Sequence, residues 1–388
     1  MKTTLENNTL TIYLEGRIDT NNASTVESDI FAAVHANPGA EIIVDAEKLE
    51  YISSAGLRVL MKLRKQVKKA LSVLNVSRDV YDIFETTGFT ELLDVKKALR
   101  VVSVEGCEKI GEGGVGAVYR LDKDTIIKVF KDKMTSASSE SEIRMAKKAF
   151  QMGVPTAISY DVVKVGDGIG IVYELIDSDT LANEIMEQPD RLSEYARDYV
   201  NLLLEIQNIK VKPGELDDAR TVLMRYAEGM AYFFPKEEVD KLRGLAATIP
   251  EGDSFVHGDF HLKNIMVQNG EFLLIDMGGN ARGNRMIDLA GTGLVLKAMP
   301  EVLAPGKSQQ YSGVSDEIAA KMWGEIVDLY CASTGLEKDY VERVVEAYSY
   351  YRLLTAIYFV PGMGTDAEKQ KVKEKVFEII NSGFRFDA

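Results

Sequence analysis

The sequence predicts a chain in two parts, an α/β part with a mixed sheet and then an α+β part. Strand and helix patterns alternate with short connections through the first hundred residues. Strand patterns around a glycine-rich segment follow, and helical patterns dominate the remainder. The 388 residues, 46% hydrophobic and 27% charged, suit two or three folded domains. We expect one domain over 1–100 and another over 101–388, the latter with lobes at about 101–176 and 177–388.

The expected elements of the first part follow from the period of their apolar residues. Strand patterns have every second residue apolar, whereas helix patterns repeat every three to four residues. In chain order these are a strand Leu10–Leu14, a helix Ala23–His35, a strand Glu41–Asp45, a helix from Ser54 to Lys69, a strand Leu71–Val76, a helix from Arg78 and a strand Leu99–Val104.

Charge and cysteine content limit the classes of function. The formal charge is -14, of which the first hundred residues carry only -1. Such an acidic second part disfavours nucleic acid as a partner, and it either attracts a cationic small molecule or simply keeps the protein soluble. Two distant cysteines, Cys107 and Cys331, suggest a reducing compartment. With no apolar run of signal-peptide or membrane-spanning length, we expect a cytoplasmic protein without a membrane partner.

The segment Tyr51–Arg58, YISSAGLR, lies where the second predicted strand gives way to a helix. Ser53 or Ser54 can cap that helix. The segment resembles the signature loop of STAS domains, the anti-sigma-factor-antagonist type of regulatory module, and the resemblance extends over about residues 3–100. It implies binding of a protein partner, often switched by serine phosphorylation, and Ser54 matches the acceptor. Ser53 and Ala55 depart from the D-S-[ST]-G pattern of phosphorylated members, so a serine that only caps remains the alternative.

A glycine-rich segment opens the second part. Gly111, Gly113, Gly116 and Val118 satisfy G-x-G-x-x-G-x-V, and strand patterns stand on both sides of the segment. A dinucleotide fingerprint needs a helix after the glycines, whereas a kinase glycine loop joins two strands over the nucleotide phosphates. The flanking strands favour the second interpretation.

A lysine and a glutamate follow at suitable distances. Lys128 lies in the strand Ile126–Val129, where an ammonium can reach the α and β phosphates, although a surface lysine is the alternative. The predicted helix Ser136–Met152 carries Glu142, the candidate partner of that lysine, with Glu140 as its competitor.

The segment FVHGDFHLKN, Phe255–Asn264, carries the most specific pattern. Phosphoryl transfer needs a carboxylate at the acceptor hydroxyl, an amide oxygen for Mg²⁺ and a second carboxylate between metal and phosphates. Asp259, Asn264 and Asp276 supply these groups, with Asp259 and Asn264 spaced as in H-x-D-x4-N.

These segments together resemble the protein-kinase-like superfamily, and HGDFHLKN resembles its aminoglycoside phosphotransferase and choline kinase branch. The resemblance covers about residues 104–388 and implies a bilobal fold, with a β-rich N-lobe and a mostly helical C-lobe, that uses ATP and Mg²⁺. It also implies a hinge at Tyr173–Ile176, where Glu174 and Ile176 meet adenine, and a bracing role for Asp288 in the catalytic loop.

The remaining polar residues of the loop allow more than one interpretation. His257 and His261 could belong to a metal site, but support of the loop is the preferred role for both. Lys263 could touch the transferring phosphate or be a surface charge, since lysine acts as a mobile point charge.

The chain lacks an APE triplet after Asp276, and only Gly278–Ile287 precedes the helix expected at Asp288. A platform for a peptide therefore looks absent, and a small hydroxylated acceptor is favoured: aminoglycoside-, choline- or sugar-like. Helices between Ile318 and Phe384 could hold it, or could be ordinary amphipathic helices with a buried aromatic stripe; the candidate residues are Trp323, Glu325, Asp328, Tyr350 and Tyr351.

Two alternatives to a small-molecule phosphotransferase stay open: a nucleotide-sensing adaptor, and a protein kinase acting on Ser54 or another STAS domain.

Overall fold

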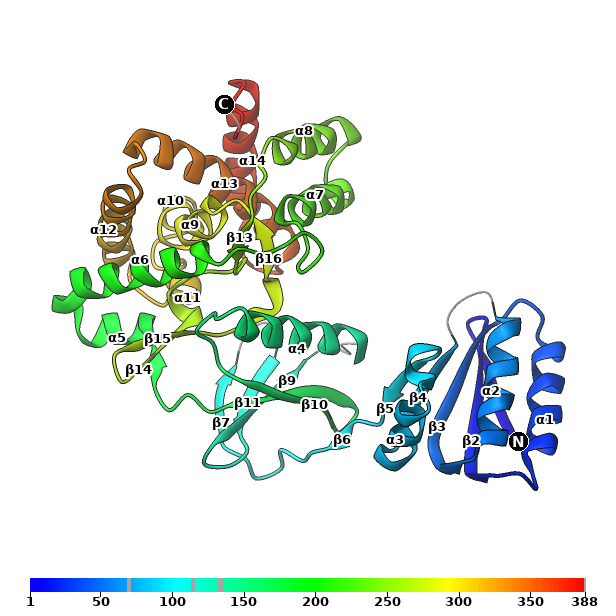
Figure 1. The fold of residues 1–388 in the computed structure, drawn as a ribbon. Helices are drawn as coiled ribbons and strands as arrows, with labels where there is room; N and C mark the ends of the chain where they lie inside the picture. The colour runs from blue at the N-terminus through cyan, green and yellow to red at the C-terminus, as the bar shows by residue number, and fades with distance from the viewer. Residues whose placement is uncertain (68–70, 113–115, 132–135, 387–388) are drawn as a thin grey trace. The chain divides into compact units, whose positions relative to one another are not determined.

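The structure is a computed structural model that describes residues 1–67, 71–112, 116–131 and 136–386, without the side chains of 136–140. By its internal contacts the chain divides into two compact units, Met1–Ser103 and Val104–Ala388 (Figure 1). Each unit has its own hydrophobic core.

The first unit is a five-stranded mixed sheet covered by helices. Strands β1 and β2 are antiparallel, and the pairs β2–β3, β3–β4 and β4–β5 are parallel, so the predicted α/β class with a mixed sheet is confirmed. The elements are β1 (Lys2–Glu6), β2 (Thr9–Ile18), α1 (Ala23–Ala36), β3 (Glu41–Ile52), α2 (Ser54–Gln66), β4 (Ser72–Val76), α3 (Arg78–Thr86) and β5 (Asp94–Lys97).

Three expectations for this unit need correction. Strand β1 was not expected; it pairs with β2 through Asn7 and Asn8, which both have positive φ, because asparagine tolerates the left-handed conformation that a tight hairpin requires. Helix α2 ends at Gln66, and Lys69, the predicted end, lies outside the described residues. The predicted strand Leu99–Val104 is present only as the two-residue β6 (Arg100–Val101).

Helix α2 begins directly after β3, as the small residues of the YISSAGLR segment predict. The Ser53 side chain accepts a hydrogen bond from the Gly56 N–H at 3.5 Å and so caps the helix, while Ser54 is exposed at its first position. A Cβ at Gly56 would lie 2.7 Å from side-chain atoms of Ile18 and Ile52, so only glycine lets the helix approach the sheet this closely.

The second unit opens with an antiparallel sheet in which β10, β11, β9, β8 and β7 are neighbours in that order. Helix α4 packs against β10 and β11. The bounds are β7 (Lys109–Glu112), β8 (Gly116–Arg120), β9 (Thr125–Phe130), α4 (Ser136–Gln151), β10 (Ser159–Val165) and β11 (Gly168–Glu174).

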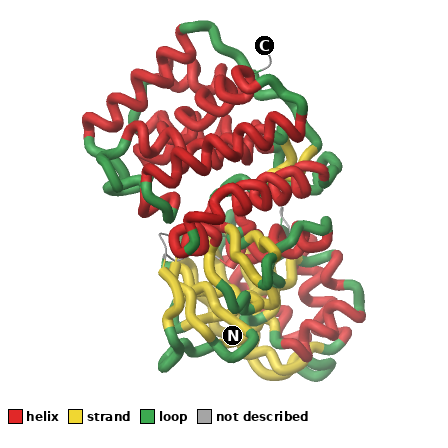
Figure 2. Tube along the Cα trace, turned by 90° about the vertical axis from the view of Figure 1, so that its left-hand side faces the viewer, coloured by secondary structure: helices red, strands yellow, loops and turns green. Residues whose placement is uncertain are grey.

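The rest of this unit is mainly helical and holds the larger core (Figures 1 and 2). Two small antiparallel sheets, β12–β14–β15 and β13–β16, carry the loops of the candidate site. The bounds are β12 (Asp179–Thr180), α5 (Leu181–Glu187), α6 (Leu192–Asn208), α7 (Ala219–Gly229), α8 (Lys236–Ala247), β13 (Ser254–Val256), β14 (Ile265–Gln268), β15 (Glu271–Leu274), β16 (Ala281–Gly283), α9 (Met286–Gly293), α10 (Met299–Val302), α11 (Gln309–Ser312), α12 (Asp316–Thr334), α13 (Lys338–Phe359) and α14 (Asp366–Asn381). The predicted β-rich part followed by a helical part is confirmed.

A tight hairpin brings two distant parts of the sequence together. Strands β14 and β15 pair from Gln268–Glu271 out to Ile265–Leu274 across the two-residue turn Asn269–Gly270. Both turn residues have positive φ, at 53° and 83°, as the right-handed twist of a two-residue hairpin demands. The residues just outside its open end, Asn264 and Asp276, are therefore neighbours.

We predict that replacing Asn269 and Gly270 together by alanine lowers the free energy of unfolding by about 1–3 kcal/mol, because alanine is disfavoured at positive φ. Urea denaturation of the full-length chain measures this. Gly244→Ala is the matched control: a Cβ there meets no atom within 4 Å in helix α8, so this change should be neutral or stabilising by up to about 1 kcal/mol. Equal stability of the double variant and the wild type would contradict the role of the turn.

Candidate active site

A lysine on β9 links two carboxylates that are far apart in the sequence. Lys128 Nζ lies 3.1 Å from Glu142 Oε1 and 2.9 Å from Asp276 Oδ1. Glu142 comes from α4, and Asp276 follows β15, so the lysine connects the strand-rich and helical parts of the unit. The lysine and Glu142 side chains are only 17% and 11% exposed, whereas Asp276 is 44% exposed.

The carboxylates keep this lysine charged. Burial lowers the pKa of Lys128, but the nearby charges and hydrogen bonds of Asp276 and Glu142 outweigh burial and raise the pKa above its usual value. The Tyr173 hydroxyl donates a hydrogen bond to Glu142 Oε1 at 3.2 Å and fixes the glutamate from the other side; burial and the Glu142 charge raise the pKa of this tyrosine, so it stays a donor. Glu142 is thus the partner of Lys128, while Glu140 has a side chain outside the described residues.

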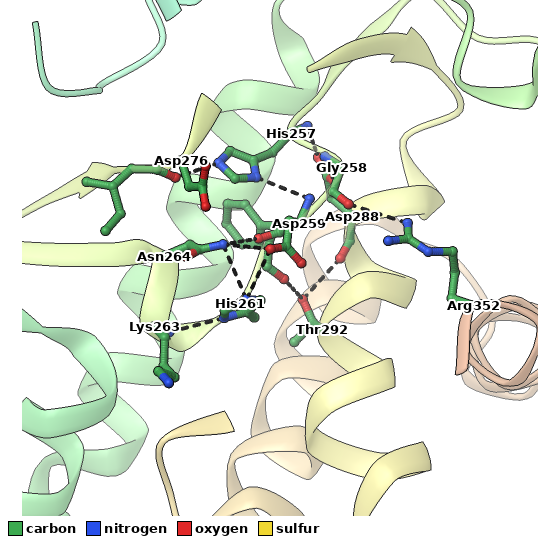
Figure 3. A network of polar contacts seen from close by, with 12 residues as sticks. His257, Gly258, Asp259, His261, Lys263, Asn264, Asp276, Asp288, Thr292 and Arg352 are labelled. Atoms are coloured by element: carbon green, nitrogen blue, oxygen red, sulfur yellow. Dashed lines mark hydrogen bonds and ion pairs between the residues drawn. The ribbon is translucent and has the colours of Figure 1, made fainter. Parts of the chain in front are cut away.

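The loop between β13 and β14 carries a second polar cluster (Figure 3). The Asn264 amide N–H₂ donates to the Asp259 backbone carbonyl at 2.9 Å and to Asp259 Oδ2 at 3.0 Å. His261 Nε2 lies 3.4 Å from the same carboxylate oxygen. Burial opposes ionisation of Asp259, but the interaction with His261 outweighs burial and holds the pKa of this carboxyl well below its usual range. Asp259 is therefore an ionised acceptor at neutral pH.

His257 joins this loop to the strand end that carries Asp276. Its Nδ1 accepts from the Asp259 backbone N–H at 3.2 Å, so the ring proton is on Nε2, which donates to the Ile275 carbonyl at 3.1 Å. The Ile275 N–H in turn donates to the Asn264 carbonyl at 3.0 Å. Both backbone polar groups of Ile275, the residue before Asp276, are thus held, which confirms the supporting role predicted for His257.

Asp288 on α9 binds the first residues of the loop between β13 and β14. Its two carboxylate oxygens accept the backbone N–H groups of His257 and Gly258 at 2.8 and 2.9 Å. The residue is only 1% exposed, and burial raises the pKa of its carboxyl in spite of these donors. The bracing position predicted for Asp288 is confirmed.

The backbone has an unusual, left-handed conformation at Gly258 and at Asp276. Gly258 has φ +84°, and a Cβ there would lie 2.5 Å from the Gly279 carbonyl oxygen, so only glycine fits. Asp276 has φ 62° and ψ 59°, a left-handed conformation that costs about 1–3 kcal/mol for a non-glycine residue. Strain of this kind concentrates at functional sites, and here it aims the carboxylate toward Lys128.

The glycine segment and the hinge are described in part. Gly111 lies in β7 opposite Val118 of β8, and Gly116 lies so close to β9 that a Cβ would be 2.4 Å from the Val129 carbonyl oxygen. Gly113 lies outside the described residues. Glu174 ends β11 and donates its N–H to the Ile158 carbonyl, and the Ile176 carbonyl accepts from Ser178.

The donor set fits a hard divalent cation. Asn264 uses its amide N–H₂ toward Asp259, which leaves the amide oxygen as a possible ligand, and Asp276 is the half-exposed carboxylate beside it. Two carboxylates, those of Glu142 and Asp276, contact one lysine, a surplus of negative charge that oxygen-preferring Mg²⁺ would offset. Within the described ranges there is no group of three or more His, Cys, Asp and Glu side chains that could hold a metal ion, so the two loop histidines do not form such a site.

Several residues considered for the transferring phosphate or for the acceptor make other contacts. Lys263 donates to the Gln310 carbonyl at 3.0 Å and thereby packs against α11. The aromatic candidates are core residues, which contradicts their proposed contact with an acceptor: Trp323, Tyr350 and Tyr351 are 7%, 6% and 2% exposed. Glu325 accepts from Ser193, and Asp328 pairs with Lys338 on the surface. The amphipathic-helix interpretation of these residues is the correct one.

Sequence reasoning missed Arg352, whose Nη1 lies 3.4 Å from the Gly258 carbonyl oxygen (Figure 3). It also missed Tyr199 and Thr292, whose hydroxyls are 2.7 Å apart and both bond to the Phe260 carbonyl. These residues are distant in sequence and belong to no short motif, so the chain alone carries no signal for them.

A family model described as the phosphotransferase enzyme family matches residues 106–319, more than half of the chain. The chain belongs to this family. A second model, the STAS domain, matches residues 1–102, so this phosphotransferase-family chain carries a STAS domain at its N-terminal end. Both resemblances inferred from the motifs are confirmed.

Individual relatives exist for each part of this family member. A Bordetella bronchiseptica protein named as an anti-sigma factor antagonist, BtrV, is 32% identical over 85 residues, which are 21% of this chain and 72% of that protein. The ADP-bound aminoglycoside phosphotransferase APH(2'')-Ib is 14% identical, with 78% of this chain and 97% of the other covered and a TM-score of 0.46. A choline/ethanolamine kinase family protein from Mesorhizobium loti is 12% identical, with 71% and 87% covered and a TM-score of 0.45.

The structure also bears on the membrane question. Among the described residues no helix has both the length and the apolar character needed to cross a bilayer.

We predict that Asp288→Leu lowers the free energy of unfolding by about 2–4 kcal/mol, because two buried N–H groups lose their acceptor. Asp288→Asn retains one acceptor oxygen and should cost roughly half as much. Chemical denaturation measures both. The control is Asp240→Leu, an exposed residue in a surface ion pair with Lys236, where a change within about 0.5 kcal/mol is expected. An Asp288→Leu effect no larger than this control would contradict the brace.

Proposed function

We propose that this chain is an ATP- and Mg²⁺-dependent phosphotransferase that transfers the γ-phosphoryl group to a hydroxyl of a small molecule. The observation that carries the proposal is one continuous polar network: Lys128 pairs with Asp276, and His257 and Asn264 connect the Asp276 segment to Asp259. Family membership supports a phosphotransferase reaction, and the nucleotide, metal and acceptor class are our inferences.

Each residue of the network has a distinct part in such a reaction. When bound, Mg·ATP supplies the transferable phosphoryl group and a divalent charge. Asn264 through its amide oxygen and Asp276 through its carboxylate would hold the metal, and Lys128, kept charged by its two carboxylate neighbours, would hold phosphate oxygens. Asp259, ionised and aimed by Asn264 and His261, would accept the hydrogen bond of the acceptor hydroxyl and take up its proton.

The nucleotide would lie under the glycine segment. Gly111, Gly113, Gly116 and Val118 are proposed to cover its phosphates, with Glu142 orienting Lys128 and the backbone at Glu174 and Ile176 meeting adenine. Aminoglycoside-, choline- and sugar-like alcohols remain candidate acceptors at this level, because the short segment from Gly278 to the helix α9 offers little surface for a peptide.

The STAS domain is proposed to bind a protein partner and to regulate the phosphotransferase domain, with the domains divided near residue 100. Ser54 is exposed while Ser53 caps α2, so the Ser54 hydroxyl is available for modification. This favours one second candidate function, a protein kinase that acts on Ser54 of this or another STAS domain.

We predict that an ADP-release assay over aminoglycosides, choline-like amines, sugars, nucleosides and hydroxy acids finds turnover of at least one small alcohol. Asp259→Asn should lower kcat for it by about 10³-fold or more, since positioning and charge supply nearly all of the catalysis. Asp253→Asn, an exposed carboxylate paired with Lys210 on the same segment, is the control and should retain activity.

The outcomes of that screen separate the candidates. Radiolabel from ATP on Ser54 without any added acceptor, lost in Asp259→Asn, would favour the protein kinase instead. Nucleotide binding with neither turnover nor label would contradict the phosphotransferase proposal.

We predict that His261→Leu raises the pKa of Asp259 and so moves the acidic limb of the kcat/KM profile upward, because His261 is the main group that lowers the pKa of Asp259. The sign follows from the protonation state. As pH falls through the pKa of Asp259, the base is protonated and the rate falls; without His261 this happens at a higher pH. A profile of kcat/KM from pH 9 down to the lowest pH at which both proteins stay folded, checked by circular dichroism, measures it. An unshifted acidic limb would remove His261 from this role.

A further inference from the structure

An arginine from the C-terminal helices approaches the catalytic loop from the side away from Asn264 (Figure 3). Arg352 lies in the second half of α13, and its Nη1 is 3.4 Å from the Gly258 carbonyl oxygen. Asp259 follows directly in the chain, and the arginine charge contributes to the low pKa of that carboxyl. Arg352 is therefore a cation close to the proposed position of the acceptor hydroxyl.

This guanidinium has no carboxylate partner. Among the residues that the structure describes, no Asp or Glu oxygen lies within 4 Å of Arg352; its side chain has the long hydrogen bond to the Gly258 carbonyl and an interaction with the Tyr348 hydroxyl. A guanidinium has five N–H donors. Charged side chains removed from water are normally paired, because desolvation costs several kcal/mol per ion. Asp288, the other nearby acid, already uses both oxygens for the backbone.

The neighbours of Arg352 form a site that is partly open. The Tyr226 ring on α7 lies with its centroid 5.6 Å from the guanidinium carbon and is 41% exposed. On the same helix as Arg352, the Tyr348 hydroxyl is buried, lies close enough to interact with the guanidinium and has no other hydrogen-bond partner within the described residues. A positive charge, a hydroxyl beside it and a partly exposed aromatic ring are thus grouped next to the catalytic loop.

We propose that Arg352, with Tyr226 and Tyr348, binds an anionic group of the acceptor, so that the substrate is a small alcohol bearing a carboxylate or a phosphate. This inference rests on the proposed function and narrows its substrate class. An amine-bearing acceptor would instead place a second positive charge beside Arg352, and the carboxylates that would offset it are already bound by backbone, Asn264, His261 or Lys128.

Matched acceptors that differ only in charge test this on the full-length chain. A three-carbon series compares glycerate and glycerol 3-phosphate with glycerol and with serinol, its amine analogue; gluconate, glucose 6-phosphate, glucose and glucosamine form a six-carbon series. We expect an anionic member of a series to exceed its neutral and cationic analogues by at least about tenfold in kcat/KM. The carboxylate and phosphate arms distinguish the two sources of anion.

Substitutions assign the preference to this arginine. Arg352→Met should lower kcat/KM for the anionic acceptor by about 100-fold with little change in the KM for ATP, and Arg352→Lys should retain part of the activity. Arg343→Met, at an exposed position of the same helix, is the matched control. Equal losses for neutral and anionic analogues in Arg352→Met would mean that Arg352 only supports the loop, and faster turnover of amines by the wild type would overturn the inference directly.

Chemical modification of the arginine tests the anion site without enzymatic turnover, so its result can be distinguished from that of the phosphotransferase assay. Phenylglyoxal modifies arginine, and mass spectrometry can follow adduct formation at Arg352 and at Arg343. Glycerate, gluconate or the two sugar phosphates should slow labelling of Arg352 and leave Arg343 unaffected, with glycerol as the neutral control. Protection of Arg352 without turnover of any acceptor would support the anion site and count against the phosphotransferase proposal. Undiminished labelling with every anion, in protein that still binds ATP, would overturn the anion site alone.

Discussion

The candidate site depends on the way both backbone polar groups of Ile275, the residue that precedes Asp276, are held. The Ile275 N–H is bonded to the Asn264 carbonyl, and the Ile275 carbonyl is bonded to the His257 ring. The first contact follows from the open end of the β14–β15 hairpin and the second from the catalytic loop, so two separate parts of the chain fix the position of Asp276. The left-handed backbone at that residue persists because these contacts outweigh its conformational cost.

Charge balance explains how this geometry can be both stable and ready to bind. Lys128 is shared between a well-buried glutamate, which is also bonded to Tyr173, and a half-exposed aspartate. The glutamate contact is structural, whereas the aspartate keeps an exposed edge toward solvent. Across the loop, Asp259 is ionised while the acid below it, Asp288, is occupied by two backbone N–H groups. Neighbouring acids therefore have different roles because their environments differ.

Much of this arrangement was predictable from the chain, for specific physical reasons. The hydrophobic periods identified the mixed sheet and most helices, and the spacing of Asp259, Asn264 and Asp276 identified the groups that converge. The hairpin that brings these groups together was also encoded in the sequence, by the Asn269–Gly270 pair, but no hairpin was predicted from that pair. Other features depend on tertiary packing and could not be predicted from local sequence patterns. The exposure of an aromatic residue depends on helix packing, which is why Trp323 and Tyr350 were wrongly considered for the acceptor. Arg352 reaches the loop only through the fold of α13, over a long separation in sequence.

The most direct test of the central claim is a crystal structure of the full-length chain with a non-hydrolysable ATP analogue and Mn²⁺, whose anomalous scattering locates the metal. Our account predicts a metal peak at about 2.0–2.3 Å from both the Asn264 amide oxygen and an Asp276 carboxylate oxygen, with Lys128 at the phosphates. Nucleotide bound elsewhere, or Asn264 and Asp276 directed away from a shared metal, would contradict it.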